Sequence, residues 1–247
     1  MSSPGTGHST AANGQSGEPP AGSIESLYPF LYSGKTDVSA VLEQVRQSTA
    51  AKAAEILQLR RTVLAADGAR LLACARDMAA RFAAGGRLLS FGNGGSATDA
   101  QQLATMFLAP GGAARPLPAL GLASDPAVLT ALSNDIGVDV VFARQIAALG
   151  ARQDIAVGLS TSGNSDNLLR AFDEASRRGL LTIGIAGYSG GKMAELESID
   201  YLFVAPSTSV HRIQEAQTTI YDALWELCQA VLTGPEPARF HPGEAAP

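Results

Sequence analysis

The sequence contains few cysteines, few charged residues and no long apolar run. Cys74 and Cys228 are its only cysteines among 247 residues. Each lies in an apolar, helix-like setting, which favours small core residues over a disulfide, a metal-binding pair or a nucleophile. No stretch approaches the roughly 18 consecutive apolar residues that a membrane-spanning helix needs, since the richest runs, such as 180–186, have the length of strands.

The first residues also lack the features of a secretory signal. They read Met-Ser-Ser-Pro-Gly-Thr-Gly-His, with neither a basic region nor an apolar core after it. Together with the missing membrane span, this predicts a cytoplasmic protein without a membrane partner.

An excess of basic residues is absent as well, because the formal net charge is −5. Nucleic-acid-binding proteins usually gather Lys and Arg on one face, so no direct nucleic-acid partner is expected. The basic pairs Arg60-Arg61 and Arg177-Arg178 fit solvated helix faces. A small anion is still allowed, because backbone amides bind phosphate without any net positive charge.

The composition, 46% apolar and 17% charged, fits one globular domain between two tails. Residues 1–22 and 234–247 are rich in Ser, Gly, Pro and Ala, which predicts disorder. The domain is expected over 37–232. The aromatic segment Leu27–Tyr32, around Pro29, is expected to pack against the domain or a partner.

The first part of the domain, 37–84, shows helical periodicity from a predicted N-cap at Asp37. A break near Asp67-Gly68 predicts an antiparallel helical pair. After Gly85-Gly86 the pattern changes to short apolar runs separated by helix-length segments, which is typical of a parallel sheet with crossover helices. We therefore predict a doubly wound five-stranded parallel α/β sandwich over 87–232, with strands at 87–91, 117–122, 154–159, 180–185 and 201–204. Helices are expected at 96–108, 126–134, 141–149, 164–178, 191–196 and 210–232.

Two strand-to-helix loops carry the chemistry. The first reads Gly92-Asn93-Gly94-Gly95-Ser96, where glycines let the backbone approach a ligand and Ser96 and the helix-start amides can donate to an anion. The second reads Ser160-Thr161-Ser162-Gly163-Asn164-Ser165, with four hydroxyls in front of a helix N-terminus. Ligands of open parallel sheets bind beyond the carboxyl ends of the strands, so both loops can hold one phosphate. Glycine-rich turns and Ser N-caps are also ordinary features of α/β folds, which is the alternative for either loop alone.

Nucleotide sites fit these loops poorly. Gly92-Asn93-Gly94-Gly95-Ser96-Ala97 lacks the final glycine of a dinucleotide fingerprint, and a P-loop lysine is absent.

At these two loops the sequence resembles the sugar isomerase (SIS) domain family, and within it the phosphoheptose isomerases. The resemblance spans about 38–232 and includes further matching pieces at Asn134-Asp135, Gly190-Gly191-Lys192-Met193 and Arg212-Ile213-Gln214-Glu215. It implies a five-stranded SIS fold, a homodimer or homotetramer, and a site formed partly between subunits that binds sedoheptulose 7-phosphate. It also implies that phosphate is held by Ser96, Ser160, Thr161, Ser162 and Ser165, and the sugar by Asn93, Gly94, Gly95, Asp135 and Gln214.

The catalytic and zinc-binding positions depart from that family. Where the isomerases carry a catalytic Glu and a catalytic His, this chain has Met106 and Asp222. The second zinc-binding His corresponds to Gln102, and only Gln214 is retained. Methionine cannot accept a proton at neutral pH and Gln is a poor zinc ligand, so the catalytic residues are unassigned and no metal or other cofactor is expected.

Two alternatives remain for residues that could replace the missing Glu–His acid–base pair. Asp99, Glu215 and Asp222 lie in the relevant predicted helices and could form a shifted acid–base pair, or be ordinary helix and surface carboxylates. Of the three histidines, His8 and His241 fall in the predicted tails, so only His211 could reach the substrate; otherwise it is a capping or surface residue.

Three functions are compatible with these residues. On mechanism we favour a module that binds a phosphosugar for sensing or assembly with a protein partner, as in the SIS-type regulator of bacterial replication initiation, which this sequence also resembles. The alternative is an active aldose–ketose isomerase with a rearranged acid–base pair. A purely structural oligomer leaves the hydroxyl-rich second loop unexplained.

Overall fold

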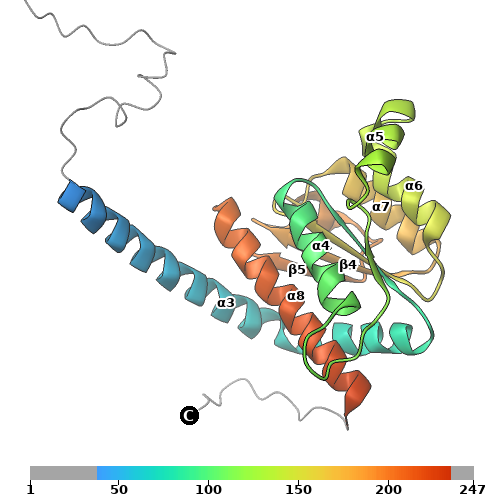
Figure 1. Cartoon of the computed structure of the whole chain (residues 1–247), viewed down its shortest axis with the longest axis horizontal. Helices are drawn as coiled ribbons and strands as arrows, with labels where there is room; N and C mark the ends of the chain where they lie inside the picture. Colours follow the sequence, from blue (N-terminus) through green and yellow to red (C-terminus); the bar gives the residue numbers. More distant parts are fainter. Residues whose placement is uncertain (1–37, 235–247) are drawn as a thin grey trace, which may run out of the picture. The chain divides into compact units, whose positions relative to one another are not determined.

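A computed structural model describes residues 38–234 of the chain (Figure 1). The segment Leu27–Tyr32, the tail 1–22 and the tail after Gly234 lie outside the described residues. Contacts divide the chain into two units, with the boundary between Ala51 and Lys52. The first unit is described only over 38–51, where a helix begins. The second unit contains the sheet and both loops of interest.

The helix that begins at Val38 continues to Ala83, as α3 (Val38–Ala83). The predicted break at Asp67-Gly68 and the predicted helical pair are therefore wrong. One glycine inside a helix costs only about 1 kcal/mol relative to alanine. Val63 and Leu71, which flank Gly68, are buried in the core, and their packing outweighs that cost.

The remaining elements alternate along the chain as predicted. The strands are β1 (Leu88–Gly92), β2 (Ala119–Gly121), β3 (Ile155–Ser160), β4 (Leu181–Gly187) and β5 (Tyr201–Ala205). The α-helices after β1 are α4 (Gly95–Leu108), α5 (Pro126–Asp135), α6 (Val141–Leu149), α7 (Asp166–Arg177) and α8 (Val210–Thr233). Two short 3₁₀ helices are η1 (Val138–Val140) and η2 (Gly191–Glu195).

The five strands form one parallel sheet in the order β2-β1-β3-β4-β5. This confirms the predicted doubly wound sheet. The chain runs from β1 outward to β2 and then returns to β3 on the other side of β1. The connections therefore diverge between β1 and β3, which is where open α/β sheets bind ligands.

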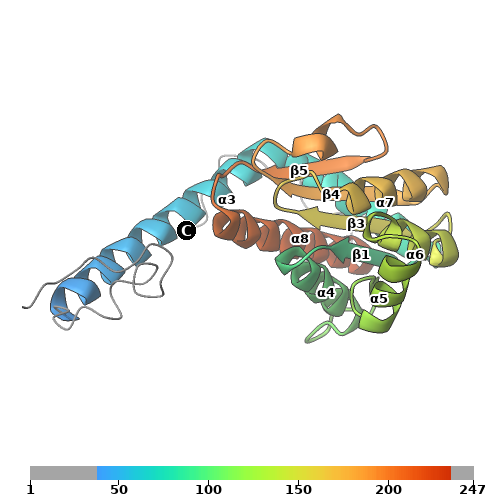
Figure 2. The same ribbon diagram turned by 90° about the horizontal axis from the view of Figure 1, so that it is seen from above.

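The helices cover the two faces of the sheet (Figures 1 and 2). Side chains alternate along β1, so Leu88 packs with residues of α3, α4 and α8, while Leu89 packs with residues of α6 and α7. Both cysteines are fully buried on the α3 and α8 side, and burial raises the pKa of the Cys228 thiol to about 12. The prediction that they are core residues is confirmed.

Two elements are shorter or tighter than predicted. The strand expected at 117–122 is reduced to Ala119–Gly121, and the helix expected at 191–196 is the 3₁₀ helix η2. Gly190 and Gly191 both have positive φ, 94° and 54°, which makes the turn into η2 too tight for an α-helix. Across 38–234, none of the helices has the length and apolar character required to cross a bilayer.

Candidate functional site

The first loop is a tight turn between β1 and α4. Gly94 has φ 54° and precedes the first helical residue, Gly95. A Cβ on Gly92 would lie 2.5 Å from the carbonyl oxygen of Ser96, so only glycine fits there. Asn93, Gly94 and Gly95 are exposed, whereas Ser96 is buried and its amide donates to the Asn93 carbonyl over 3.0 Å. The turn therefore presents its backbone outward.

A pair of amide side chains joins this loop to the second one. Asn93 and Asn167 exchange two hydrogen bonds, each 2.9 Å long, and Asn167 is buried in the first turn of α7. The strands are neighbours as well, since Gly92 pairs with Leu159 in the sheet. The two loops thus lie side by side at the point where the connections diverge.

The second loop is braced by its own hydroxyls. Ser160 Oγ accepts a hydrogen bond from the Gly163 amide over 3.1 Å, and Ser162 Oγ accepts one from the Asn164 amide over 3.2 Å. Each hydroxyl retains its proton for donation to a ligand. Ser165 is the N-cap of α7 but its side chain makes no capping hydrogen bond, and Thr161, Ser162 and Ser165 are partly exposed. These groups are available to an anion.

The turn after β4 supports the second loop from behind. Gly163 has φ 67°, its carbonyl accepts from the Met193 amide over 3.0 Å, and Asn164 Oδ1 accepts from the Lys192 amide over 2.9 Å. A Cβ on Gly163 would approach the Gly190 carbonyl closer than any real Cβ contact. In the sequence, Gly190-Gly191 was noted only as part of a motif that resembles the family. Its role in supporting the second loop was not predicted.

Lys192 adds a cation that was not predicted either. Its ammonium lies 3.1 Å from Asp166 Oδ1, and Asp166 is the first residue of α7. Both side chains are more than half exposed, so the pair is worth little in stability. Its importance is its place beside the second loop, where a positive charge favours a phosphate.

Two glutamines of α8 reach the loops. The predicted sugar-binding residue Gln214 lies against the first loop, because a Cβ on Gly95 would collide with its Nε2. Gln217, fully buried, donates from Nε2 to the carbonyls of Ser160 over 3.2 Å and Ile185 over 3.0 Å. Gln217 therefore fixes the end of β3. This role could not be predicted from the sequence, because it depends on the burial of Gln217 in the folded chain.

Asp99 lies near Gln214. Burial raises the pKa of the Asp99 carboxyl, and the side chain of Gln214 acts in the opposite direction by hydrogen bonding to it. The same carboxyl contributes to raising the pKa of the buried Tyr221, after the larger effect of burial itself.

The remaining predicted residues are not brought to the loops by any contact found within 38–234. Asp135 is the exposed last residue of α5, and its carboxylate accepts from Asn134 Nδ2 over 3.0 Å. His211 is the exposed second residue of α8. Its neighbour Arg212 is paired with Glu215 and lies 3.7 Å from Glu55.

Comparison with known proteins identifies the family of the chain. A family model described as the SIS domain matches residues 38–187. The chain belongs to the SIS domain family. Its relatives include the phosphoheptose isomerase of Solidesulfovibrio magneticus, 47% identical over 156 residues, which are 63% of this chain and 75% of that protein. The phosphoheptose isomerase of Pelodictyon phaeoclathratiforme is 43% identical over 178 residues, 71% of this chain and 84% of that one.

Solved SIS-family structures show the same fold. The phosphoheptose isomerase of Neisseria gonorrhoeae superposes with a TM-score of 0.68 at 33% identity, covering 74% of this chain and 97% of that chain. The one from Francisella tularensis gives a TM-score of 0.68 at 30% identity, covering 76% and 98%.

The sequence resemblance assigned the isomerase acid–base and zinc positions to Met106, Gln102, Gln214 and Asp222, and the structure gives the surroundings of each. Met106 packs partly buried against the core on the α3 and α8 side, and Gln102 is exposed on α4. Asp222 is partly buried on α8. Its carboxyl has a raised pKa, first because of burial and then because of Glu226, while Arg60 acts against both. If these four side chains formed the site that the resemblance implies, a thioether, two amides and one carboxylate would be a donor set that does not fit zinc.

Proposed function

We propose that this SIS-domain protein binds a phosphosugar of the sedoheptulose 7-phosphate class at loops 92–96 and 160–165. The observation that carries the proposal is the reciprocal pair between Asn93 and Asn167, which holds the two loops together at the divergence point of the sheet. Ser96, Ser160, Thr161, Ser162 and Ser165 would hold the phosphate, with Lys192 nearby. Asn93, Gly94, Gly95 and Gln214 would face the sugar, and Asp135, at the end of α5, would join them as the resemblance implies.

Ligand-dependent stabilisation tests this proposal. A ligand at one hundred times its dissociation constant should add about 2.7 kcal/mol to the free energy of unfolding. We expect sedoheptulose 7-phosphate to raise the melting temperature of the full chain, and Ser162→Ala to reduce the rise. If no phosphosugar shifts the melting temperature of the wild type, the proposal is wrong.

Binding without turnover is the first form of this proposal, because Met106 stands where the isomerases have a proton-transferring Glu. Loss of general acid–base help typically costs about two to four orders of magnitude in rate. A sensing or assembly role with a protein partner would then use the pocket without chemistry.

An active aldose–ketose isomerase is the second form, and one observation favours it. Asp99 and Asp222 are carboxyls with raised pKa values on α4 and α8, the two helices that carry the acid–base positions in the resemblance. Conversion of sedoheptulose 7-phosphate by the purified protein, above the rate of Ser162→Ala, would establish this form. Absence of turnover with retained binding would establish the first.

Zinc is not needed in either form of the proposal. The donors Gln102, Met106, Gln214 and Asp222 would form a poor zinc site. We expect purified protein to contain less than about one zinc per ten chains, and a chelator to leave phosphosugar binding unchanged, with about one zinc per chain as the contrary result.

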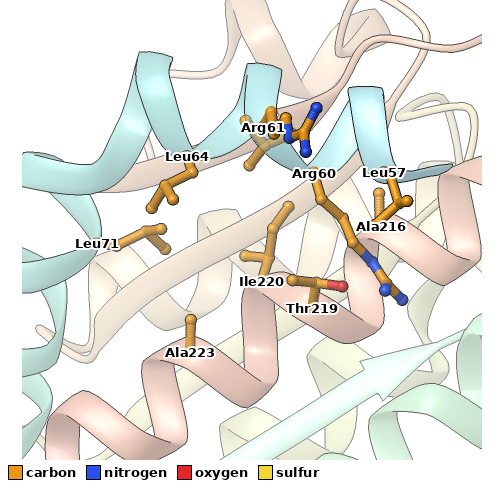
Figure 3. Close-up of a pocket in the computed structure, with 10 residues that line it drawn as sticks. Leu57, Arg60, Arg61, Leu64, Leu71, Ala216, Thr219, Ile220 and Ala223 are labelled. Atoms are coloured by element: carbon orange, nitrogen blue, oxygen red, sulfur yellow. The ribbon is translucent and has the colours of Figure 1, made fainter. Parts of the chain in front are cut away.

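A homo-oligomer belongs to the proposal as well. A groove of about 340 Å³ runs between α3 and α8 (Figure 3). Leu57, Leu64 and Leu71 line it at intervals of seven residues, as in helices that pack on another helix, and Leu57 and Leu64 are 52% and 47% exposed. We propose that a helix of a second copy covers it. Light scattering should give a dimer or tetramer for the wild type and a smaller species for Leu57→Glu/Leu64→Glu.

A further inference from the structure

Arginines gather at the amino ends of the strands, at the edge of the sheet opposite to the two loops of the candidate site. Arg87 directly precedes β1, and Arg152 and Arg178 each stand three residues before a strand, β3 and β4. These strands are adjacent and parallel, so the residues before them share one edge. A six-residue strand such as β3 is about 20 Å long, which separates this edge from the second loop.

Arg81, in the last turn of α3, joins the turns that precede β3 and β4. Its Nη1 donates to the Gly179 carbonyl over 2.9 Å and also to the carbonyl of Arg152. The side chain of Arg152 lies along Gly179, since a Cβ on that glycine would be 3.3 Å from Arg152 Cγ. Arg81 and Arg152, 71 residues apart in sequence, therefore lie side by side.

Arg87 and Arg178 hold the segment between α6 and β3 in the same way. Arg87 donates from Nη2 to the carbonyl of Leu149. Arg178 donates from Nη1 to the carbonyl of Gly150 over 3.4 Å. These carbonyls fix the guanidinium groups without cancelling their charge, because a carbonyl is a neutral acceptor.

The positive charge at this edge is only partly balanced. Arg177, the last residue of α7, shares the Glu174 carboxylate with Arg178. Asp154 pairs with Arg87 over 3.2 Å. The C-terminal ends of α3 and α7 add about half a negative charge each, so within 38–234 an excess of about two positive charges remains in a chain whose net charge is −5. We call this set the arginine cluster, and its members are Arg81, Arg87, Arg152, Arg177 and Arg178.

Support of the turns does not account for the whole arginine cluster. Arg152 is exposed, and among the described residues its guanidinium has no hydrogen bond or ion pair. The side chain of Arg177 is 69% exposed. A guanidinium presents a planar fork of N–H donors that matches a carboxylate. The exposed members are therefore suited to bind carboxylates from outside the chain.

We propose that the arginine cluster is a docking surface for an acidic segment of a partner protein, whose carboxylates pair with Arg152, Arg177 and Arg178. Charges are screened beyond about 8 Å at physiological ionic strength, so a short acidic segment meets the cluster and not the net negative charge of the chain. A nucleic acid that extends beyond the cluster would meet that charge. This surface goes beyond the phosphosugar site and does not depend on it.

The test measures binding of a fluorescent peptide of about ten glutamates to the full chain by anisotropy. Arg152→Glu/Arg177→Glu should weaken binding about tenfold, because each reversal replaces an attraction by a repulsion. This variant keeps the carbonyl bonds of Arg81, so its melting temperature should stay near that of the wild type. Arg170→Glu, which reverses an exposed arginine in the middle of α7, should bind as the wild type does. Added salt should weaken wild-type binding.

The remaining outcomes decide against the proposal. A wild type that does not bind the peptide, or equal binding by the wild type and Arg152→Glu/Arg177→Glu, would overturn it. Tighter binding of a single-stranded DNA of about ten nucleotides would assign the surface to nucleic acid instead. Arg152→Gln/Arg177→Gln, with an expected loss of about threefold, supplies the comparison should the reversed variant fail to fold. Sedoheptulose 7-phosphate should bind equally to the wild type and to these variants, so the proposed function stands or falls separately.

Discussion

The two loops of the candidate site are built from similar residues but are held in different ways. The first loop, 92–96, is fixed by side chains from distant elements: Asn167 of α7 bonds Asn93, and Gln214 of α8 lies on Gly95. The second loop, 160–165, also receives a side chain from α8, since Gln217 donates to the Ser160 carbonyl, and Ser160, Ser162 and Asn164 make side-chain bonds of their own. Its middle, however, is held backbone against backbone, with Gly163 packed against the turn at Gly190 and its carbonyl accepting from the Met193 amide.

Because of this difference, we expect the two loops to respond differently to amino-acid substitution. Backbone packed on backbone cannot move aside, whereas the end of a glutamine side chain can rotate. The second loop should therefore be rigid and suited to a phosphate of fixed geometry. Substitutions in the first loop should therefore have small effects on stability and larger effects on ligand binding.

The strongest test of the contrast is Gly163→Ala. The new Cβ would collide with the backbone carbonyl of Gly190, and φ at this position is 67°. We expect a loss of about 3 kcal/mol or more in the free energy of unfolding, together with loss of phosphate binding. Chemical denaturation measures the first and calorimetry the second. A variant as stable as the wild type would show that the second loop is not rigid.

Asn93→Ala should have the next largest effect. It removes both hydrogen bonds to the buried side chain of Asn167 and leaves that amide unpaired, which costs about 1 to 3 kcal/mol. Urea unfolding would report the loss. Asn93→Ala/Asn167→Ala should lose less than the sum of the single changes. Strict additivity would mean that the pair does not join the loops.

Gly95→Ala should change stability by less than about 1 kcal/mol, because the added Cβ meets only the flexible end of Gln214 and helix positions favour alanine. It should nevertheless weaken phosphosugar binding by displacing Gln214. Melting temperature and ligand affinity are to be measured on the same sample. A large loss of stability here, comparable with Gly163→Ala, would remove the distinction between the loops.

The smallest effect is expected from Asp99→Asn, and it should be a gain in stability. Burial raises the pKa of the Asp99 carboxyl in the folded chain above the ordinary value of 3.8, so the folded state binds its proton more tightly than the unfolded state. The wild type therefore loses stability as pH rises through the folded pKa. The melting temperature of the variant should exceed that of the wild type at about pH 8, and the gap should close towards about pH 4. A difference in melting temperature between variant and wild type that does not change with pH would show that the ionisation of Asp99 is not the cause.

Much of the fold could be predicted from local patterns. The spacing of apolar runs predicted all five strands and the α/β order, and Pro126 and Val141 were predicted correctly as the starts of α5 and α6. The break at Gly68 was mispredicted because a glycine signals a turn locally, whereas the burial of Val63 and Leu71 that keeps α3 continuous is a tertiary effect.

The candidate site was only half predictable for the same reason. The glycines and hydroxyls of 92–96 and 160–165 are contiguous in sequence, and their composition by itself indicates an anion. Gln217 and the Gly190 turn are remote from both loops in sequence, and Asn167 follows the second loop but supports the first, 74 residues away, so nothing in their local pattern marks them as supports.

The amino-acid order alone decided which backbone segments can turn tightly and donate to an anion, because conformational freedom and hydroxyl content are properties of neighbouring residues. Only the folded chain decided that β1 and β3 are adjacent, that Asn93 meets Asn167, and that Asp99 lies beside Gln214. Those facts depend on contacts across many intervening residues, which the packing of the sheet and its helices determines.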